Sequence, residues 1–169
     1  MIRVKSMELS RKEAVVLSSF MELLTLSPDR RAKWIEDVLV ESENKYFTPE
    51  RLNHQVRKCI EYQFSWFRND YLKGFLVDKL NREINITGKE PRLHTCACCG
   101  YKTLTRSGWE ICNACFWQDD GTAELPEHSS ANHMTLAEAK ANFEKFGTVS
   151  EKFLKSLHPD RFKMFQKNS

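Results

Sequence analysis

The sequence lacks any run of about 18 apolar residues, and Met1 to Ser6 do not begin a long apolar stretch. A transmembrane helix needs about 20 predominantly apolar residues, so we expect no membrane span. A secretory signal peptide also needs an apolar segment close to the N-terminus. We therefore expect a cytoplasmic protein rather than a secreted one.

A strong net charge is missing too, because Lys+Arg 26 stand against Asp+Glu 23, a formal charge of +3. Proteins that bind nucleic acid through its phosphates usually gather Lys and Arg in a patch or stripe. No dense stripe of this kind occurs, and no acidic excess that could mimic DNA. At 41% hydrophobic and 29% charged residues, the composition is that of an ordinary globular protein.

Four of the six cysteines form two Cys-x-x-Cys pairs, and residues 100–111 separate the pairs. Two thiolates three positions apart can share one tight turn, and two such turns can surround one ion with a tetrahedron of sulfur, which zinc prefers. Gly100 directly follows the first pair and permits the positive φ that such a turn needs. The spacing therefore predicts a zinc site with the ligands Cys96, Cys99, Cys112 and Cys115.

Three other interpretations of the pairs are disfavoured. A disulfide framework is typical of small, cysteine-dense secreted domains, and this chain is neither small nor cysteine-dense. A thioredoxin-type redox centre needs one pair in a strand–helix context and has no use for a second. Iron in a rubredoxin-like centre uses the same four thiolates, so spacing leaves it open; we favour zinc because nothing else indicates electron transfer.

The remaining cysteines and nearby histidines have ordinary explanations. We expect Cys98 to be a spare thiol, because one ion could not take it together with both neighbouring cysteines without strain. Cys59 lies in a helical pattern and should be a small buried residue. His94, His128 and His133 could replace a cysteine, but four thiolates already close a structural site.

The predicted fold class is α+β, mainly helical, in two domains. We expect a helical bundle over 1–90 and a metal-binding domain over 91–169, with a polar connector at 82–93. The second domain should contain a small zinc-ribbon-like β-hairpin followed by C-terminal helices, over 135–147 and 151–157.

Local signals place the helices of the first domain. Ser10 with Glu13 is a capping box, and Pro28 and Pro49 suit first helical turns. The pattern after Pro49 predicts one long helix, or two that are broken around Gly74. An aromatic group in this pattern is expected to lie mainly in the core; its members are Tyr62, Phe64, Trp66, Phe67, Tyr71 and Phe75.

In the second domain, the short β-type runs 101–104 and 109–111 are expected to pair as a hairpin that joins the two cysteine pairs. Phe116 and Trp117 follow the second pair and should cover the metal site. The next three residues, Asp119-Asp120-Gly121, are predicted to form a turn.

Several motifs of the second domain occur in a recognisable order: Cys96-Ala-Cys-Cys-Gly-Tyr-Lys-Thr-Leu104, Gly108-Trp-Glu-Ile-Cys112-Asn-Ala-Cys-Phe-Trp-Gln-Asp-Asp120, Ser130-Ala-Asn132 and Leu136-Ala-Glu-Ala-Lys-Ala-Asn-Phe143. In these motifs the chain resembles the cysteine-rich CPCC proteins of bacteria, over about residues 94–148. The family's proline after the first cysteine is Ala97 here, and its glutamate before the aspartate pair is Gln118.

The resemblance implies a function, because many family members resemble small cytoplasmic partners that are encoded with secreted polymorphic toxins. It implies a non-enzymatic immunity protein that binds and neutralises a cognate secreted toxin domain. The expected anchors of such a surface are exposed rings, such as Trp66 or Trp109, and the polar loop 119–133.

Two alternatives stay open. A zinc-ribbon nucleic-acid-binding regulator is disfavoured, since zinc on four thiolates would bring the formal charge from +3 to about +1. A metal-associated enzyme is disfavoured because a closed site of four thiolates leaves no position for water. Its candidate residues would be Asp119, Asp120, Asn132 and His133.

Overall fold

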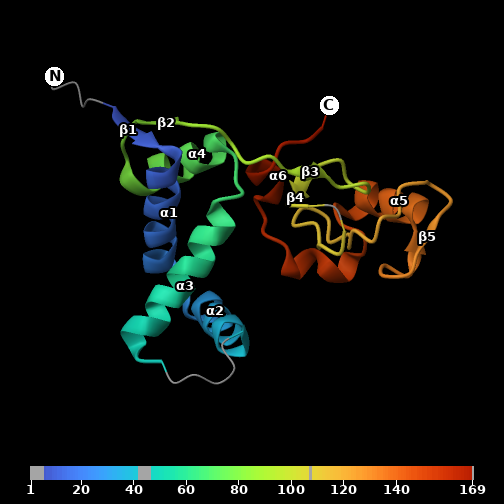
Figure 1. Ribbon diagram of the computed structural model, residues 1–169, viewed down its shortest axis with the longest axis horizontal. Helices are drawn as coiled ribbons and strands as arrows, with labels where there is room; N and C mark the ends of the chain where they lie inside the picture. The colour runs from blue at the N-terminus through green and yellow to red at the C-terminus, as the bar shows by residue number, and fades with distance from the viewer. Residues whose placement is uncertain (1–5, 42–46, 107, 169) are drawn as a thin grey trace. The chain divides into compact units, whose positions relative to one another are not determined.

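The computed structural model describes residues 6–41, 47–106 and 108–168, and the chain divides into two compact units, Met1–Pro91 and Arg92–Ser169. The predicted α+β, mainly helical class is confirmed (Figure 1). No helix in the described residues is long and apolar enough to cross a membrane.

In its described residues, 6–41 and 47–91, the first unit consists of four helices and one pair of strands (Figure 1). The capping box at the first helix is confirmed, since the Glu13 carboxylate accepts from the Ser10 N–H at 2.8 Å. The elements are β1 (Met7–Ser10), α1 (Arg11–Thr25), α2 (Pro28–Glu41), α3 (Pro49–Phe64), α4 (Asn69–Leu80) and β2 (Ile84–Thr87).

The break in the third helical pattern lies elsewhere than expected. Gly74 is inside α4, and the chain turns between Phe64 and Asn69 instead. The guanidinium of Arg11, far away in sequence, donates to the carbonyls of Ser65 and Phe67, each at 2.7 Å. These bonds satisfy carbonyls at the C-cap of α3 and in the short link to α4, so the turn is stabilised from outside its own sequence.

The connector expected at 82–93 contains a strand that the prediction missed. β2 pairs in parallel with β1, from Met7 opposite Ile84 to Ser10 opposite Thr87. Ile84 is fully buried with Ala14 and Leu76 in the core of this unit. The alternation of isoleucine with polar residues in β2 was the available signal, because period-two patterns are typical of half-buried strands.

α1 lies along α3 in Figure 1, and small buried residues of α1, Ser18 and Ser19, permit their close approach. Buried Arg57 of α3 is paired with Glu61 on the same helix. Burial raises the pKa of Glu61, but hydrogen bonds and charges from Arg57 and Lys58 bring that pKa below its ordinary value.

The aromatic group is divided between core and surface. Phe64 and Phe67 are buried and their ring centroids are 5.1 Å apart, whereas Tyr62 is exposed. Trp66, Tyr71 and Phe75 are half-buried.

In its described residues, the second unit has two short strand pairs, two isolated β-bridges and a few short helices. α5 begins with the predicted capping box of Thr135 and Glu138 and ends at Gly147, as expected. The segment expected as a last helix is a short 3-10 helix. The elements are β3 (His94–Thr95), β4 (Lys102–Leu104), β5 (His128–Ser129), β6 (Met134–Thr135), α5 (Leu136–Phe146), η1 (Glu151–Ser156) and α6 (Arg161–Met164).

The small hairpin is formed by other strands than the ones predicted. β4 pairs antiparallel with β3 rather than with 109–111, and Ile111 forms its bridge with Gln118. Each short pairing therefore surrounds one cysteine pair, instead of joining the two pairs to each other.

Candidate metal centre

The first Cys-x-x-Cys turn, residues 96–100, is closed by two backbone hydrogen bonds. The Cys96 N–H donates to the Tyr101 carbonyl at 2.9 Å, and the Gly100 N–H donates to the Cys96 carbonyl at 3.0 Å. Gly100 has φ 76°, the left-handed conformation that the sequence predicted for it. We call this turn the first knuckle.

The second turn, residues 112–116, repeats the same backbone pattern, and we call it the second knuckle. The Cys112 N–H donates to the Trp117 carbonyl at 2.8 Å, and the Phe116 N–H donates to the Cys112 carbonyl at 2.8 Å. Phe116 stands where the first knuckle has its glycine and has φ 71°. A non-glycine residue in this conformation is strained, so the knuckle geometry is maintained here despite a side chain that disfavours it.

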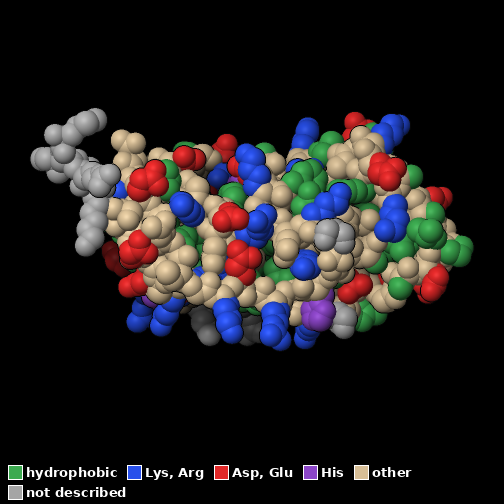
Figure 2. Space-filling view, turned by 90° about the horizontal axis from the view of Figure 1, so that it is seen from above, with side chains coloured by type: hydrophobic (Ala, Val, Ile, Leu, Met, Phe, Trp, Pro, Cys, Tyr) green, Lys and Arg blue, Asp and Glu red, His purple; other side chains and the backbone are tan. Residues whose placement is uncertain are grey.

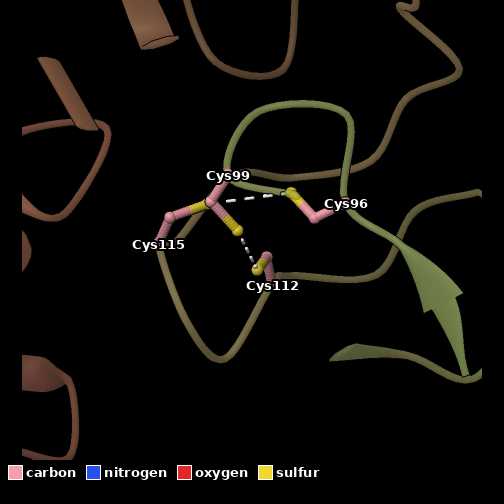
Figure 3. Close-up of side chains that lie close together, drawn as sticks. All are labelled: Cys96, Cys99, Cys112 and Cys115. Atoms are coloured by element: carbon pink, nitrogen blue, oxygen red, sulfur yellow. Dashed lines mark hydrogen bonds between the residues drawn. The ribbon is translucent and has the colours of Figure 1, made fainter. Parts of the chain in front are cut away.

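The two knuckles direct four sulfur atoms toward one point (Figure 3). The Sγ atoms of Cys96, Cys99, Cys112 and Cys115 all lie within 4.8 Å of one another. The Sγ of Cys96 is 3.7 Å from that of Cys115, and the Sγ of Cys99 is 3.6 Å from that of Cys112. Zinc at about 2.3 Å from each of four sulfurs requires S–S separations of about 3.8 Å. The donor set therefore fits one tetrahedrally coordinated ion.

The same distances exclude a disulfide framework. A disulfide bond is about 2.0 Å long, well below the separations found between these sulfurs. None of these four cysteines takes part in a disulfide bond. The four cysteines thus form a potential metal site in their observed arrangement.

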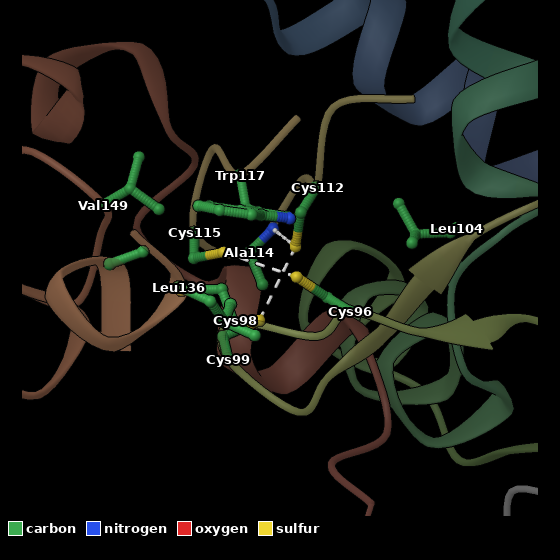
Figure 4. Packing of buried hydrophobic residues seen from close by; sticks show 11 residues of the cluster. Cys96, Cys98, Cys99, Leu104, Cys112, Ala114, Cys115, Trp117, Leu136 and Val149 are labelled. Carbon is green, nitrogen blue, oxygen red and sulfur yellow. Dashed lines mark hydrogen bonds between the residues drawn. The ribbon is translucent and has the colours of Figure 1, made fainter. Parts of the chain in front are cut away.

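The four cysteines are part of the core of the second unit (Figure 4). Each is at most 5% exposed, and Trp117, Leu136 and Val149 are buried in the same cluster. The expectation that Trp117 and Phe116 cover the site is confirmed: Trp117 is fully buried in this cluster, and Phe116 packs against it. Such a shell keeps water away from the sulfurs, as in a closed structural metal site.

Hydrogen bonds to one sulfur favour its deprotonated form. The Thr103 hydroxyl lies 3.0 Å and the Ala114 N–H lies 3.4 Å from Sγ of Cys112. Burial raises the pKa of Cys112, but the neighbouring thiols and Thr103 bring that pKa well below its usual value. The pKa of Cys99 and that of Cys115 are raised, first of all by their hydrogen bonds with Cys112. Four thiolates in one buried group repel one another, so a bound cation would be needed to deprotonate all four.

A buried arginine supplies positive charge beside the second knuckle. Arg161 is 8% exposed, and its Nε donates to the Ala114 carbonyl at 2.9 Å. Its other nitrogens donate to the carbonyls of Gly147 at 3.1 Å and His158 at 3.3 Å. Four thiolates around a dication would carry two net negative charges, which a nearby buried guanidinium would partly offset. Sequence reasoning missed Arg161, because its role depends on a contact with a residue 47 positions away.

The other cysteines and the histidines lie outside the four-sulfur group. Cys98 is buried in the same core cluster but does not belong to the group, as expected of a spare thiol. Cys59, expected to be buried, is only half-buried. His94, His128 and His133 are exposed, and none belongs to the metal-type group found in the described residues.

The polar residues of the loop after Trp117 form hydrogen bonds within the loop and with the segment before the second knuckle. Asp119 accepts from the Gly108 N–H at 2.8 Å, and Asp120 accepts from the Ser129 hydroxyl at 2.7 Å. Burial raises the pKa of Asp120, but hydrogen bonds from the Ser129 side chain and from the side chain and backbone of Thr122 bring this pKa below its ordinary value. Asn132 donates to the Gln118 carbonyl at 2.8 Å. Asp120 also accepts from the Thr122 N–H at 3.2 Å, the local contact of a turn-forming residue.

Comparison with known proteins gives one family. The family model described as cysteine-rich CPCC matches residues 94–162, which include both knuckles and extend through α5 and η1 to Arg161. No curated protein and no solved structure matches the chain. Fold and site thus define a cysteine-rich protein with a potential tetrathiolate metal centre, whose second unit is similar to the CPCC family.

Proposed function

We propose that this chain is a non-enzymatic protein-binding module whose second unit is held together by one zinc ion. The observation that carries the proposal is the buried tetrahedral arrangement of the four sulfurs of Cys96, Cys99, Cys112 and Cys115. Bound zinc would cross-link the two knuckles, which have little other regular structure to stabilise them. Because four thiolates fill a tetrahedral shell, the proposed ion has a structural role rather than a catalytic one.

Exposed apolar side chains on the second unit favour protein binding. Trp109 is 73% exposed, and Ile111 and Leu125 are also exposed. Large aromatic side chains on a surface are frequent anchors of protein interfaces. Acidic and basic side chains both occur across the face seen in Figure 2, which favours a protein partner over the phosphate backbone of a nucleic acid.

The more specific proposal is an immunity protein that binds and neutralises a cognate secreted toxin domain in the cytoplasm. Its support is the similarity of the second unit to the CPCC family, together with exposed Trp109, whose N–H donates to the carbonyl of Asp119 in the loop after the second knuckle. Such a protein requires a specific surface and no catalytic residues. The metal would fix that surface without a large core.

The proposal predicts that a toxin domain is encoded beside this gene, and co-expression of the two proteins tests it. Wild-type protein should protect the cell, and Trp109→Ala should weaken binding by about 2 kcal/mol if the ring is an anchor. Leu24→Ala removes an apolar side chain of similar exposure, 76%, from the first unit and serves as the matched control. Absence of binding between wild-type protein and the toxin domain would refute the immunity function, while leaving the metal centre to be judged by metal analysis.

A further inference from the structure

A pocket of about 270 Å³ opens beside the second knuckle. Its apolar walls include Ile111, Phe116, Met134 and Phe153. The rings of Phe116 and Phe153 are stacked, with centroids 4.1 Å apart and an angle of 18° between their planes. We call this cavity the knuckle pocket. Its volume is below the usual range for small-molecule sites and suits one large side chain.

Backbone strain is concentrated at this pocket. Phe116 has φ 71° and His133 has φ 55°, and both line it. Trp109, with φ 64°, is two residues before the pocket-lining Ile111. Left-handed conformations of non-glycine residues cost free energy and persist mainly at functional sites, so their position here favours a binding role.

The lining of the knuckle pocket contains one lysine, Lys152, whose charge indicates which ligands the pocket can bind. Lys152 is the only Lys, Arg, Asp or Glu side chain in the lining, and its Nζ lies 4.8 Å from the centroid of the Phe153 ring. None of the ion pairs in the described part of the chain involves Lys152. An apolar cavity with a lysine at its rim complements an aromatic side chain that has a carboxylate next to it.

We propose that the knuckle pocket receives one aromatic side chain of the partner protein, while an adjacent Asp or Glu of that partner pairs with Lys152. The inference rests on the proposed protein-binding function and specifies the chemistry of the partner. The aromatic ring packs against Phe116, Phe153 and Ile111. The ion pair with Lys152 makes the pocket specific for an aromatic residue that has an acidic neighbour. An exposed ion pair contributes to specificity more than to affinity.

Two dipeptide probes test this proposal with the full-length, metal-loaded protein: acetyl-Phe-Asp-amide and acetyl-Phe-Lys-amide. In an NMR titration, the acidic probe should shift the amides of Ile111, Phe153 and their neighbours. We expect it to bind about two- to fivefold more tightly than the basic probe, as for an exposed charge pair. Lys152→Glu should reverse this order, and Ile111→Ser, at an exposed position, should weaken both probes.

Lys145→Glu is the matched control, because Nζ of Lys145 lies over the Phe146 ring at 4.7 Å but outside the pocket lining. This variant should leave the order of the probes unchanged. Equal affinity of the two probes for the wild type, or an order unaffected by Lys152→Glu, would overturn the proposal. If the Lys152→Glu variant neutralises the toxin as well as the wild type does, the pocket proposal is overturned, while the proposed immunity function still holds. Normal probe binding without toxin binding would overturn only the immunity function.

Discussion

Two glycine-to-alanine substitutions should change stability in opposite directions. Gly100 in the first knuckle and Gly74 in α4 are alike in one respect, because a Cβ added at either would meet no atom within 4 Å. They differ in backbone conformation, since Gly100 has φ 76° and Gly74 is helical. Any difference in stability between the two variants is therefore caused by the backbone conformation at each position and not by a steric clash of the added Cβ.

The magnitudes follow from the two conformations. A left-handed conformation costs a non-glycine residue about 1–2 kcal/mol. Alanine also lowers the conformational entropy of the unfolded chain, which stabilises the folded state by about 0.4–1 kcal/mol. The net effect of Gly100→Ala should be to destabilise the second unit by about 1 kcal/mol. Gly74→Ala should stabilise the first unit by about 0.5–1 kcal/mol, because glycine is a poor helix former.

Native-state hydrogen exchange measures both effects, because it reports the opening of each unit separately. In metal-loaded Gly100→Ala, the knuckle amides of Cys96 and Cys112 should exchange about fivefold faster, which corresponds to about 1 kcal/mol. In Gly74→Ala, the amides of α4 should exchange more slowly. Unchanged or increased protection of the first knuckle in Gly100→Ala would refute the assignment of a strained, metal-type turn.

Three further predictions concern charge, pH and metal. Arg161→Gln removes buried hydrogen bonds and a compensating cation, so zinc should pass to a competing chromophoric chelator at least about tenfold more readily. Arg92→Gln, at an exposed arginine of the same unit, should behave as wild type. Acid should destabilise the first unit below about pH 4, because the pKa of Glu61 is lowered in the folded state. The ionised Glu61 carboxylate stabilises the folded state at pH values above its pKa in the unfolded chain. This stabilisation is lost as the pH falls through its pKa in the folded state. Acid titration by circular dichroism should therefore be shallower for Glu61→Gln. Metal removal by a chelator should expose the amides of residues 96–117 to exchange, while α1 and α3 remain protected, since they have an apolar core of their own.

The features that could be predicted from the sequence depend on neighbours within a few residues. A Cys-x-x-Cys pair and its following glycine form one turn, so their spacing alone indicates both the knuckle and its sulfurs. The same holds for the capping boxes at Ser10 and Thr135, whose partners are three residues away. The start of a helix is thus a local property, and both capping-box predictions are confirmed.

The features that were missed or wrong depend on distant partners. The turn after α3 is stabilised by Arg11, which is 54 residues from Ser65, and no pattern near Gly74 could indicate that. β4 pairs with β3 because the first knuckle brings them together, whereas period-two patterns identify strands but not their partners. The left-handed Phe116 could have been found, because it occupies in the second knuckle the position of Gly100 in the first.

The metal content of the purified protein tests the central claim most directly. Elemental analysis should find about one zinc per chain, and the Cys112→Ser, Cys115→Ser double variant should lose it. Cys98→Ser is the matched control, since Cys98 is buried in the same cluster but is not one of the four ligands, and it should retain the metal. A wild-type protein without metal or with iron in place of zinc, or a double variant that keeps a full equivalent, would contradict the account.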